Sequence, residues 1–246
     1  ILLFCTRHNL RETNIRPGDK LTPGTELPTV SVCVPARNET EDLPACLASI
    51  LASDYPKLEV LVLDDCSQDK TSEVIRSLAQ KGVRFIAGEE PRHGLLAKNQ
   101  AYQQLAEAAT GEFLLYCGVD LRFGKHDIRT LLGTLTARHK HMISVLPKGL
   151  QVQQHAGLLQ PMRYWWELAL PRRFFNRPPV LSTCWMIRRD TLLALGGFKA
   201  VNNTVIPEGY FARELATVNG YSFVRVGRHL TLASTKQFEQ QWETAV

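Results

Sequence analysis

The chain has 246 residues, of which 44% are hydrophobic and 22% charged, and its net charge is +5 at neutral pH. This composition is ordinary for a globular protein and is sufficient for one large α/β domain or two small ones. Lysine and arginine are scattered rather than gathered into a stripe, which excludes a typical nucleic-acid-binding surface. A membrane surface or an anionic substrate fits this charge better than DNA.

The cysteines do not form a recognisable disulfide or zinc pattern. There are six of them, with no C-x-x-C pair and no histidine at zinc-ligand spacing. We expect free thiols in a reducing compartment and regard disulfides as the alternative. The six are Cys5, Cys33, Cys46, Cys66, Cys117 and Cys184.

The first 28 residues differ in character from the rest of the chain. The opening "ILLFC" is shorter than the roughly 20 apolar residues that cross a bilayer, so it is either the trimmed end of a transmembrane helix or only a fragment boundary. Residues 6–28 are polar and rich in Pro and Gly. We expect 1–28 to be a juxtamembrane arm or linker. No secretory signal and no other possible membrane span is visible.

From residue 29 the chain alternates between strand and helix patterns. Strands are predicted from β-branched apolar runs, and helices from apolar residues at helical spacing, with Thr40 as a candidate N-cap. The predicted order is strand 29–35, helix 41–52, strand 58–63, helix 71–80, strand 83–87, helix 95–109 and strand 112–117. This alternation with short loops predicts a parallel sheet.

Polar residues gather where three of these strands end. The clusters are "ARNE" at 36–39, "DDCSQD" at 64–69 and "GVD" at 118–120. In parallel sheets, ligands bind beyond the carboxyl ends of the strands. The sequence therefore predicts one ligand site at this edge.

The second half has a less regular pattern. We expect a helix at 127–140, a strand at 142–147, an apolar aromatic segment at 156–170, a strand and short helix within 180–198, a helix at 207–221 and a strand at 222–226. The predicted fold is one α/β domain over 29–236 with a mostly parallel sheet flanked by helices. Its halves are a parallel part at 29–120, which carries the polar clusters, and a mixed part at 121–236, followed by a tail at 237–246.

Several side chains at the predicted edge suit particular chemistry. Asp64 and Asp65 can accept hydrogen bonds from a nucleobase or from ribose hydroxyls, and the alternative is that the whole loop serves turns and caps. For Ser67 and Asp69 we favour the cap, and for Asp65 a ligand contact. Lys98, in the first turn of a helix, can meet a diphosphate, or it is a solvated lysine.

Two further acids are candidates for catalysis. Asp120 can hold Mg²⁺ because this ion typically takes one or two protein carboxylates and fills its other positions with water and phosphate. Its alternative is an ordinary loop aspartate. Glu208, directly after Pro207 at a helix start, can be a general base or an acid favoured by the helix dipole.

The segment 156–177 combines tryptophans and phenylalanines with arginines. It can lie at the headgroup level of a membrane, or it can be a core helix with surface arginines. We favour the membrane because "ILLFC" points the same way. The residues are Trp165, Trp166, Phe174, Phe175, Arg163, Arg172, Arg173 and Arg177.

Taken in order, these motifs resemble the family-2 glycosyltransferases, which have the GT-A fold. The resemblance is carried by "VSVCVPARNETEDLPACLASILASDYPKLEVLVLDDCSQDKT", "GLLAKNQA", "GEFLLYCGVD", "MIRRDTLLALGGF" and "PEGYFARELATVNGY", and so covers about residues 29–226. It implies an inverting transfer from a nucleoside-diphosphate sugar, with 29–120 as the nucleotide-binding half and 121–236 as the acceptor half. It places the nucleotide at Pro35, Ala36, Arg37, Glu39, Asp64 and Asp65, with Lys98 nearby and Mg²⁺ or Mn²⁺ on Asp120.

The chain departs from the family pattern at two acidic positions. The D-x-D motif has Gly118 in place of its first acid, and the Glu-Asp pair has Gly209 in place of the expected base, which leaves Glu208. A Q-x-x-R-W element of processive members has only the loose echo "QFEQQW" at 237–242. These departures weaken the prediction of activity and disfavour a processive polymerase.

We therefore expect a cell-envelope glycosyltransferase on the cytoplasmic side of a membrane. Its donor would be a UDP-sugar and its acceptor a lipid or a glycan, with no nucleic-acid partner. One alternative is an inactive nucleotide-sugar-binding or scaffolding domain of a membrane glycosylation complex. Another, a nucleotidyltransferase, is disfavoured because no Gly-rich loop with Arg and Lys follows the first strand.

Overall fold

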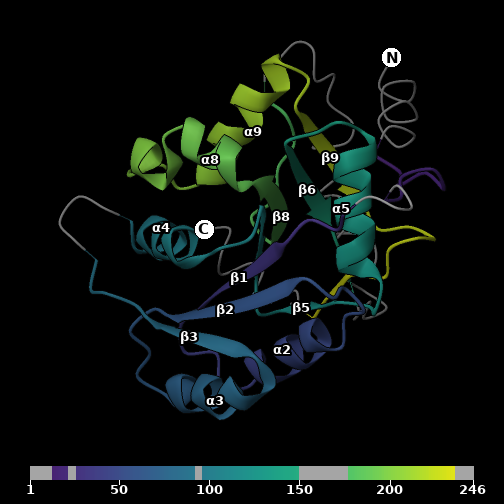
Figure 1. Ribbon diagram of the computed structural model, residues 1–246. Helices are drawn as coiled ribbons and strands as arrows, with labels where there is room; N and C mark the ends of the chain where they lie inside the picture. Colours follow the sequence, from purple (N-terminus) through teal and green to yellow (C-terminus); the bar gives the residue numbers. More distant parts are fainter. Residues whose placement is uncertain (1–12, 22–25, 92–95, 150–176, 236–246) are drawn as a thin grey trace, which may run out of the picture.

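The computed structural model describes residues 13–21, 26–91, 96–149 and 177–235, which form a central sheet with helices on both faces (Figure 1). The main sheet has seven strands in the order β3-β2-β1-β4-β8-β6-β9. Their bounds are β1 Val30–Ala36, β2 Leu58–Asp64, β3 Val83–Ala87, β4 Phe113–Cys117, β6 Met142–Leu146, β8 Cys184–Arg188 and β9 Tyr221–Arg225.

Strand direction separates the two halves of the sheet. β1 pairs in parallel with both β2 and β4, and β2 pairs in parallel with β3, which confirms the predicted parallel half. β8 is antiparallel to its neighbours β4 and β6, whereas β6 and β9 are parallel. The result is the mostly parallel sheet with a mixed second half that the sequence predicts.

Helices cover the sheet in two layers, each with its own apolar core. On one face lie α2 (Leu43–Leu51), α3 (Thr71–Ser77) and α5 (Asp127–Ala137), and on the other α4 (Ala97–Ala108), α8 (Arg189–Ala194) and α9 (Pro207–Thr217) (Figure 1). β1 alternates between the layers because successive side chains point to opposite faces. Val32 and Val34 face the first core, and Cys33 faces the second.

The second core contains a cluster of aromatic rings. Tyr116 and Trp185, which pair across β4 and β8, stack with their centroids 4.4 Å apart. Tyr102, Phe198 and Phe211 pack around Trp185 at centroid distances of 6.0, 6.1 and 6.4 Å. This cluster joins α4, α9 and the 3₁₀ turn Gly197–Val201 to the sheet, and so fixes the two helices that carry Lys98 and Glu208.

A second, three-stranded sheet was not predicted. It has the order β5-β10-β7, with β5 at Leu121–Arg122, β7 at Lys148–Gly149 and β10 at Ala233–Ser234. Each strand has two residues, which is too short to leave a periodic pattern. The small sheet brings the end of the described chain beside the loop after β4.

Some predicted boundaries were wrong. α2 begins at Leu43 with Asp42 at the N-cap, so Thr40 is not the cap. Its hydroxyl instead donates to Asp69, 2.6 Å away. The helix predicted at 71–80 ends at Ser77 and continues as a 3₁₀ turn at Ala79–Lys81, with Gly82 in the left-handed region at φ 91°.

The described part of the predicted arm is docked on the sheet. The Arg225 N–H of β9 donates to the Thr13 carbonyl, 2.9 Å away, and Asn14 forms a parallel bridge with Arg225. Arg138 at the end of α5 holds the Asp19 carboxylate at 2.6 and 2.9 Å. Residues 13–21 are therefore attached to the edge strand, while the boundary predicted at 28 and the division at 120 stay predictions.

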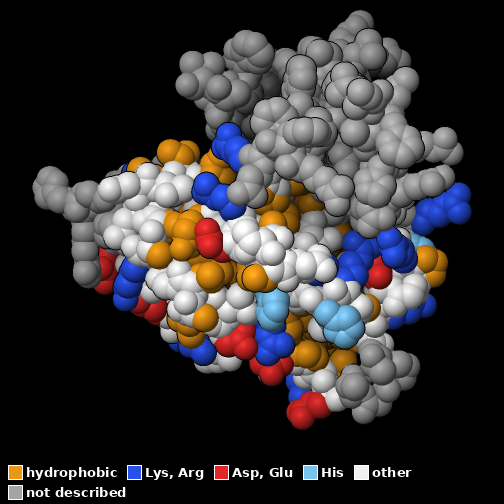
Figure 2. All heavy atoms as spheres, turned by 90° about the horizontal axis from the view of Figure 1, so that it is seen from above, with side chains coloured by type: hydrophobic (Ala, Val, Ile, Leu, Met, Phe, Trp, Pro, Cys, Tyr) orange, Lys and Arg blue, Asp and Glu red, His pale blue; other side chains and the backbone are white. Residues whose placement is uncertain are grey.

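The described cysteines are free thiols, as predicted, and Cys33, Cys46, Cys117 and Cys184 are buried. Within the described ranges no helix is long and apolar enough to cross a membrane. Most of the aromatic segment 156–177, with "ILLFC" and "QFEQQW", lies outside the described residues. On the face shown in Figure 2, basic, acidic and apolar side chains of the described surface are interspersed.

Candidate functional site

The loops after β1 and β2 lie side by side at the carboxyl edge of the sheet. Ala36 is in register with Asp64, and Asp64 with Ala87 on β3. The Asp65 N–H donates to the Ala36 carbonyl at 2.8 Å, which extends the pairing beyond the strands. This confirms that the polar clusters at 36–39 and 64–69 meet at one edge.

Side chains bind these two loops together. The Ser67 hydroxyl accepts the Asn38 N–H at 3.0 Å, and Asn38 Oδ1 accepts the Gln68 N–H at 2.8 Å. Asp69 accepts from the N–H of Thr71 at 3.0 Å and from the Thr40 hydroxyl. Hydrogen bonds from Thr40 and Thr71 lower the pKa of Asp69 to about 2. The N-cap of α3 is Lys70, without a side-chain cap, so the predicted cap role of Ser67 and Asp69 was wrong. Asp69 instead holds the first N–H of the helix from the preceding turn, and Ser67 joins the two loops.

Asp64 and Asp65 have different environments. Asp64 is 7% exposed, and its carboxylate accepts from the Ser67 N–H and the Ser72 hydroxyl. Asp65 is half-buried, with Arg37 3.9 Å away on the first loop. Burial raises the pKa of Asp65, and the Arg37 guanidinium opposes this. Asp65 and Arg37 thus form the outward-facing pair of this edge, and Asp64 holds the loop beneath it.

The third loop places Asp120 at the same edge, after β4. One carboxylate oxygen, Oδ2, accepts from the Ser234 hydroxyl at 2.5 Å, and the Asp120 carbonyl accepts from the Thr235 N–H at 2.8 Å. The other oxygen, Oδ1, lies over Gly118, where a Cβ would come within 2.6 Å of it. Asp120 is therefore held by a hydrogen bond from β10 on one side, and on the other side its carboxylate occupies the space that a side chain at Gly118 would fill.

The oxygen donors at this loop fit a hard divalent cation that the substrate helps to bind. Among the described residues, no group of three or more His, Cys, Asp or Glu is arranged to hold a metal. Asp120 is nevertheless only half-buried and carries a carboxylate, which Mg²⁺ or Mn²⁺ takes together with water and phosphate oxygens. Water and the oxygens of a bound diphosphate would complete the coordination of such an ion.

Lys98, Ser182 and Glu208 form a polar cluster next to this loop. The Lys98 ammonium lies 3.2 Å from Ser182 Oγ and 3.4 and 3.5 Å from the two oxygens of Glu208, and Ser182 also donates to Glu208. Glu208 is completely buried, while 36% of the Lys98 side chain is exposed. The cluster adjoins Gly118 because the Gly118 N–H donates to the carbonyl of Thr183 at 2.9 Å.

Two residues of this edge were not found from the sequence. Ser182 precedes β8, and Ser234 belongs to the two-residue strand β10. Neither serine belongs to a recognisable sequence motif, so no pattern in the sequence could have identified them as site residues. The predicted residues Pro35, Glu39 and Lys98 do lie at the same edge, and their roles stay predictions.

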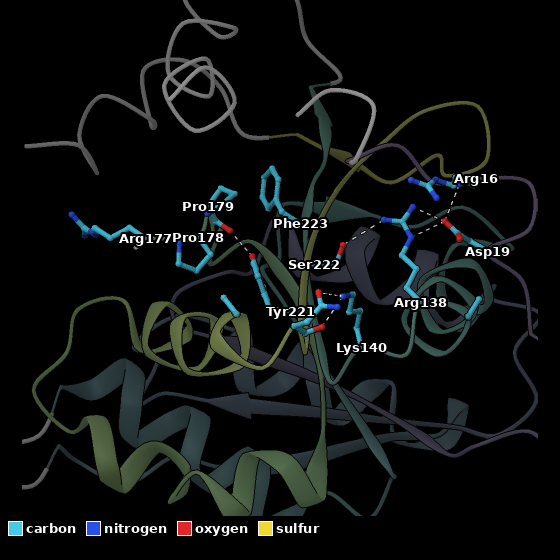
Figure 3. A pocket seen from close by; sticks show the side chains of 13 residues that line it. Arg16, Asp19, Arg138, Lys140, Arg177, Pro178, Pro179, Tyr221, Ser222 and Phe223 are labelled. Atoms are coloured by element: carbon cyan, nitrogen blue, oxygen red, sulfur yellow. Dashed lines mark hydrogen bonds and ion pairs between the residues drawn. The ribbon is translucent and has the colours of Figure 1, made fainter. Parts of the chain in front are cut away.

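A separate pocket of about 590 Å³ lies at the opposite edge, beside β9 (Figure 3). Two of its cations bind neighbouring protein groups: Arg138 holds Asp19, and Lys140 donates to the carbonyl and the side chain of Asn219 at 2.6 and 2.7 Å. Lys140 and Asn219 lie at the amino ends of β6 and β9, which run parallel to each other, whereas the loops of the candidate site follow the carboxyl ends of their strands. This pocket is therefore remote from Asp65 and Asp120 and belongs to the attachment of residues 13–21.

The fold and the edge together define an α/β domain of the kind that binds a nucleotide beyond its parallel strands. The model of the family described as glycosyl transferase family 2 matches residues 31–196. The chain belongs to this family, as the motifs predicted.

Relatives and solved structures agree with that assignment. The chain is 32% identical over 112 residues to the glycosyltransferase AglE of Haloferax volcanii, covering 44% of this chain and 37% of AglE. It is 29% identical over 124 residues to the poly(ribitol-phosphate) β-N-acetylglucosaminyltransferase TarS of Staphylococcus aureus, covering 49% of this chain and 21% of TarS. The chain thus spans about a third of the length of the first curated relatives it matches.

Similarity of fold extends further along the chain. A mannosyltransferase from Pyrobaculum calidifontis, solved with GDP-mannose and Mn²⁺, superposes with a TM-score of 0.69 at 21% identity, covering 96% of this chain and 64% of that one. TarS residues 1–349 with UDP-GlcNAc superpose with a TM-score of 0.60 at 19% identity, covering 85% and 59%. These likenesses show the GT-A type of fold.

Proposed function

We propose that the protein is an inverting glycosyltransferase that takes a sugar from a nucleoside-diphosphate sugar, with uridine as the preferred base. The observation that carries this proposal is the meeting of three loops at one sheet edge, with Asp65 and Asp120 on two of the loops and Lys98 on the adjoining helix α4. Neighbours of the same fold bind UDP-GlcNAc and GDP-mannose, which supports a nucleotide-sugar donor. The backbone of Pro35 and Ala36, with Arg37, Glu39, Asp64 and Asp65, would hold the nucleotide.

Asp120 would hold Mg²⁺ or Mn²⁺ together with the diphosphate. Bound there, the cation would neutralise the charge of the leaving nucleoside diphosphate. Lys98 supplies a second positive charge beside the same loop, and 36% of its side chain is exposed. A single carboxylate suffices because the diphosphate brings its own oxygens to the ion.

The acceptor would be a lipid-linked molecule or a glycan at the cytoplasmic face of a membrane. The support is the composition of the segment 156–177, whose tryptophans and arginines suit a headgroup region. The name of the relative TarS gives a poly(ribitol-phosphate) acceptor for that protein. The sequence makes Glu208 the candidate base for the acceptor hydroxyl, since Gly209 removes the acid that the resemblance implies, but the complete burial of Glu208 favours a different role for it.

Titration calorimetry with UDP and GDP, with and without Mn²⁺, tests the proposal. We expect UDP to bind more tightly in the presence of Mn²⁺, and Asp120→Asn to lose about tenfold of that metal-dependent affinity. Asp190→Asn, an exposed aspartate on α8, is the matched control. Binding that is absent, or that ignores both Mn²⁺ and Asp120→Asn, would contradict the proposed site.

The glycines at 118 and 209 favour one second candidate, a nucleotide-sugar-binding domain without transferase activity. Both functions share the donor site, so a binding measurement does not distinguish them. The release of free sugar from UDP-sugars in the absence of an acceptor distinguishes them. Slow hydrolysis that depends on Mn²⁺ and Asp120 supports the transferase, and tight binding with no turnover of any donor supports the second candidate.

A further inference from the structure

We propose that Glu208 and Ser182 are positioning residues that hold the ammonium of Lys98 at the donor site, and that Glu208 does not act directly on the acceptor. The inference rests on the proposed function, because it assigns Lys98 to the diphosphate of the donor. It differs from a direct base role for Glu208, and the two make different predictions.

The burial of Glu208 is the first argument. Its side chain is 0% exposed, whereas a general base must reach the hydroxyl it deprotonates directly or through one water. Ser182 and Lys98 already engage its oxygens. An enclosed carboxylate of this kind is stabilised only when its partners stay in place, because an unpaired buried charge is costly.

The surroundings of Lys98 are the second argument. Its ammonium lies 5.3 Å from the centroid of the Tyr102 ring, within the range of a cation–π interaction. Burial and the nearby Glu208 carboxylate both raise the pKa of Tyr102, so that the ring stays neutral under the ammonium. Tyr102, Ser182 and Glu208 thus all contact the Lys98 ammonium, while 36% of the Lys98 side chain stays exposed and within reach of a ligand.

The helix positions give the third argument. Lys98 lies in the first turn of α4, and Glu208 in the first turn of α9. The aromatic cluster that includes Tyr102 and Phe211 packs these helices together. Because both ends of the ion pair stand on packed helices, the ammonium has a defined place before any donor arrives. Such preorganisation is what a site for developing negative charge on a leaving diphosphate requires.

Affinity for UDP in the presence of Mn²⁺ separates the two roles. If Glu208 positions Lys98, Glu208→Gln and Ser182→Ala each weaken UDP binding by about three- to tenfold, and neither weakens it further in a Lys98→Ala background. If Glu208 is instead a direct base, Glu208→Gln leaves UDP affinity unchanged and lowers only kcat. Glu214→Gln, an exposed glutamate on α9, and Ser77→Ala, an exposed serine on α3, are the controls.

A second measurement does not need the nucleotide. The rate of reductive methylation of Lys98, followed by peptide mass spectrometry, reports how firmly its amine is held. We expect Lys98 to react several-fold faster in Glu208→Gln and Ser182→Ala than in the protein without substitutions. The rate at Lys81, an exposed lysine, should not change. An unchanged rate at Lys98 in both variants would overturn the positioning role, while absence of UDP binding to the unmodified protein would overturn the proposed function itself.

Discussion

The carboxylate of Asp120 occupies the space that a side chain on Gly118 would need, since a Cβ there would come within 2.6 Å of Asp120 Oδ1. The absence of a side chain at Gly118 therefore permits the observed position of the Asp120 carboxylate, although the same position lacks the first acid of the D-x-D motif. Restoring that acid requires the Asp120 carboxylate to move from its place beside Ser234.

A comparison of Gly118→Asp with Gly118→Asn isolates the effect of charge at this position. The two side chains have nearly the same size, so they displace Asp120 to a similar extent. If the loop binds a cation, the second carboxylate should make Mn²⁺ binding about tenfold tighter in the Asp variant. Electron paramagnetic resonance of Mn²⁺ with UDP present measures this, and equal affinities would argue against a metal at Asp120.

Gly209 differs from Gly118 because its surroundings leave room for a side chain. A Cβ there would lie 3.4 Å from Ile206 Cγ2 and 3.7 Å from Val180 Cγ1, which are ordinary contacts. Gly209 lies in the first turn of α9, where an acid is favoured by the helix dipole. We expect Gly209→Asp to change the free energy of unfolding by less than about 1 kcal/mol in chemical denaturation.

The same substitution tests the missing base. If lack of an acid at 209 limits turnover, Gly209→Asp should raise the rate of sugar transfer by about a hundredfold, the usual contribution of a general base. Gly209→Asn is the control with the same shape and no base. Equal rates in the two variants would show that proton removal does not depend on this position.

Glu59 on β2 joins several strands through one carboxylate. It accepts from the Ser31 hydroxyl at 2.5 Å, from the Thr110 N–H at 3.0 Å and from Arg84 at 2.9 Å. Burial raises the pKa of Glu59, but these hydrogen bonds outweigh it and leave the pKa below its usual value. A depressed pKa in the folded state stabilises the protein above the unfolded-state pKa, and this stability is lost as the pH falls through the folded-state value.

We therefore expect Glu59→Gln to lower the free energy of unfolding by about 1 to 3 kcal/mol at neutral pH, with the difference shrinking as the pH falls below 4.5, the ordinary pKa of a glutamate. Urea denaturation at several pH values measures both effects. Glu73→Gln, an exposed glutamate on α3, serves as the control. A difference that grows toward acid pH would have the wrong sign for this explanation.

The ion pair of Arg138 and Asp19 attaches residues 13–21 to the domain. The two side chains are 14% and 9% exposed, so removing one partner leaves a largely buried charge. We expect Arg138→Met to cost about 3 kcal/mol and to speed proteolytic cleavage within 13–21. Arg213→Met, an exposed arginine on α9, should do neither. Unchanged cleavage would mean that the strand contacts of Thr13 and Asn14 hold this segment alone.

The parallel half of the fold could be predicted because its signal is local. The β-branched run at 29–35 and the apolar run at 58–63 define buried strands, and the polar loops that follow them define the edge where ligands bind. The direction of β8 had no such signal, since "CWMIR" is equally apolar in either orientation. Its antiparallel place between β4 and β6 depends on pairing with residues distant in the sequence.

Site residues could be predicted from the sequence where they lie in loops that follow predicted strands. Asp65 and Asp120 follow strands directly, and the structure does bring them to one edge. Thr40 was wrong as a cap because α2 begins only at Leu43, with Asp42 at the N-cap, while the Thr40 hydroxyl donates to Asp69 on another loop. The enclosure of Glu208 depends on Ser182, 26 positions away, and no spacing rule connects two such residues. The site contacts that could not be predicted are those between residues that are distant in the sequence.

Ser234 and Asp120 are 114 positions apart, and their hydrogen bond gives the site an order of assembly. During synthesis the loops at 36–39 and 64–69 leave the ribosome early and can close on each other through Asn38 and Ser67. The carboxylate after β4 receives its support from β10 only when Ser234 and Thr235 have emerged. A chain cut before residue 233 would keep the paired loops of the first half and lose the strand that fixes Asp120.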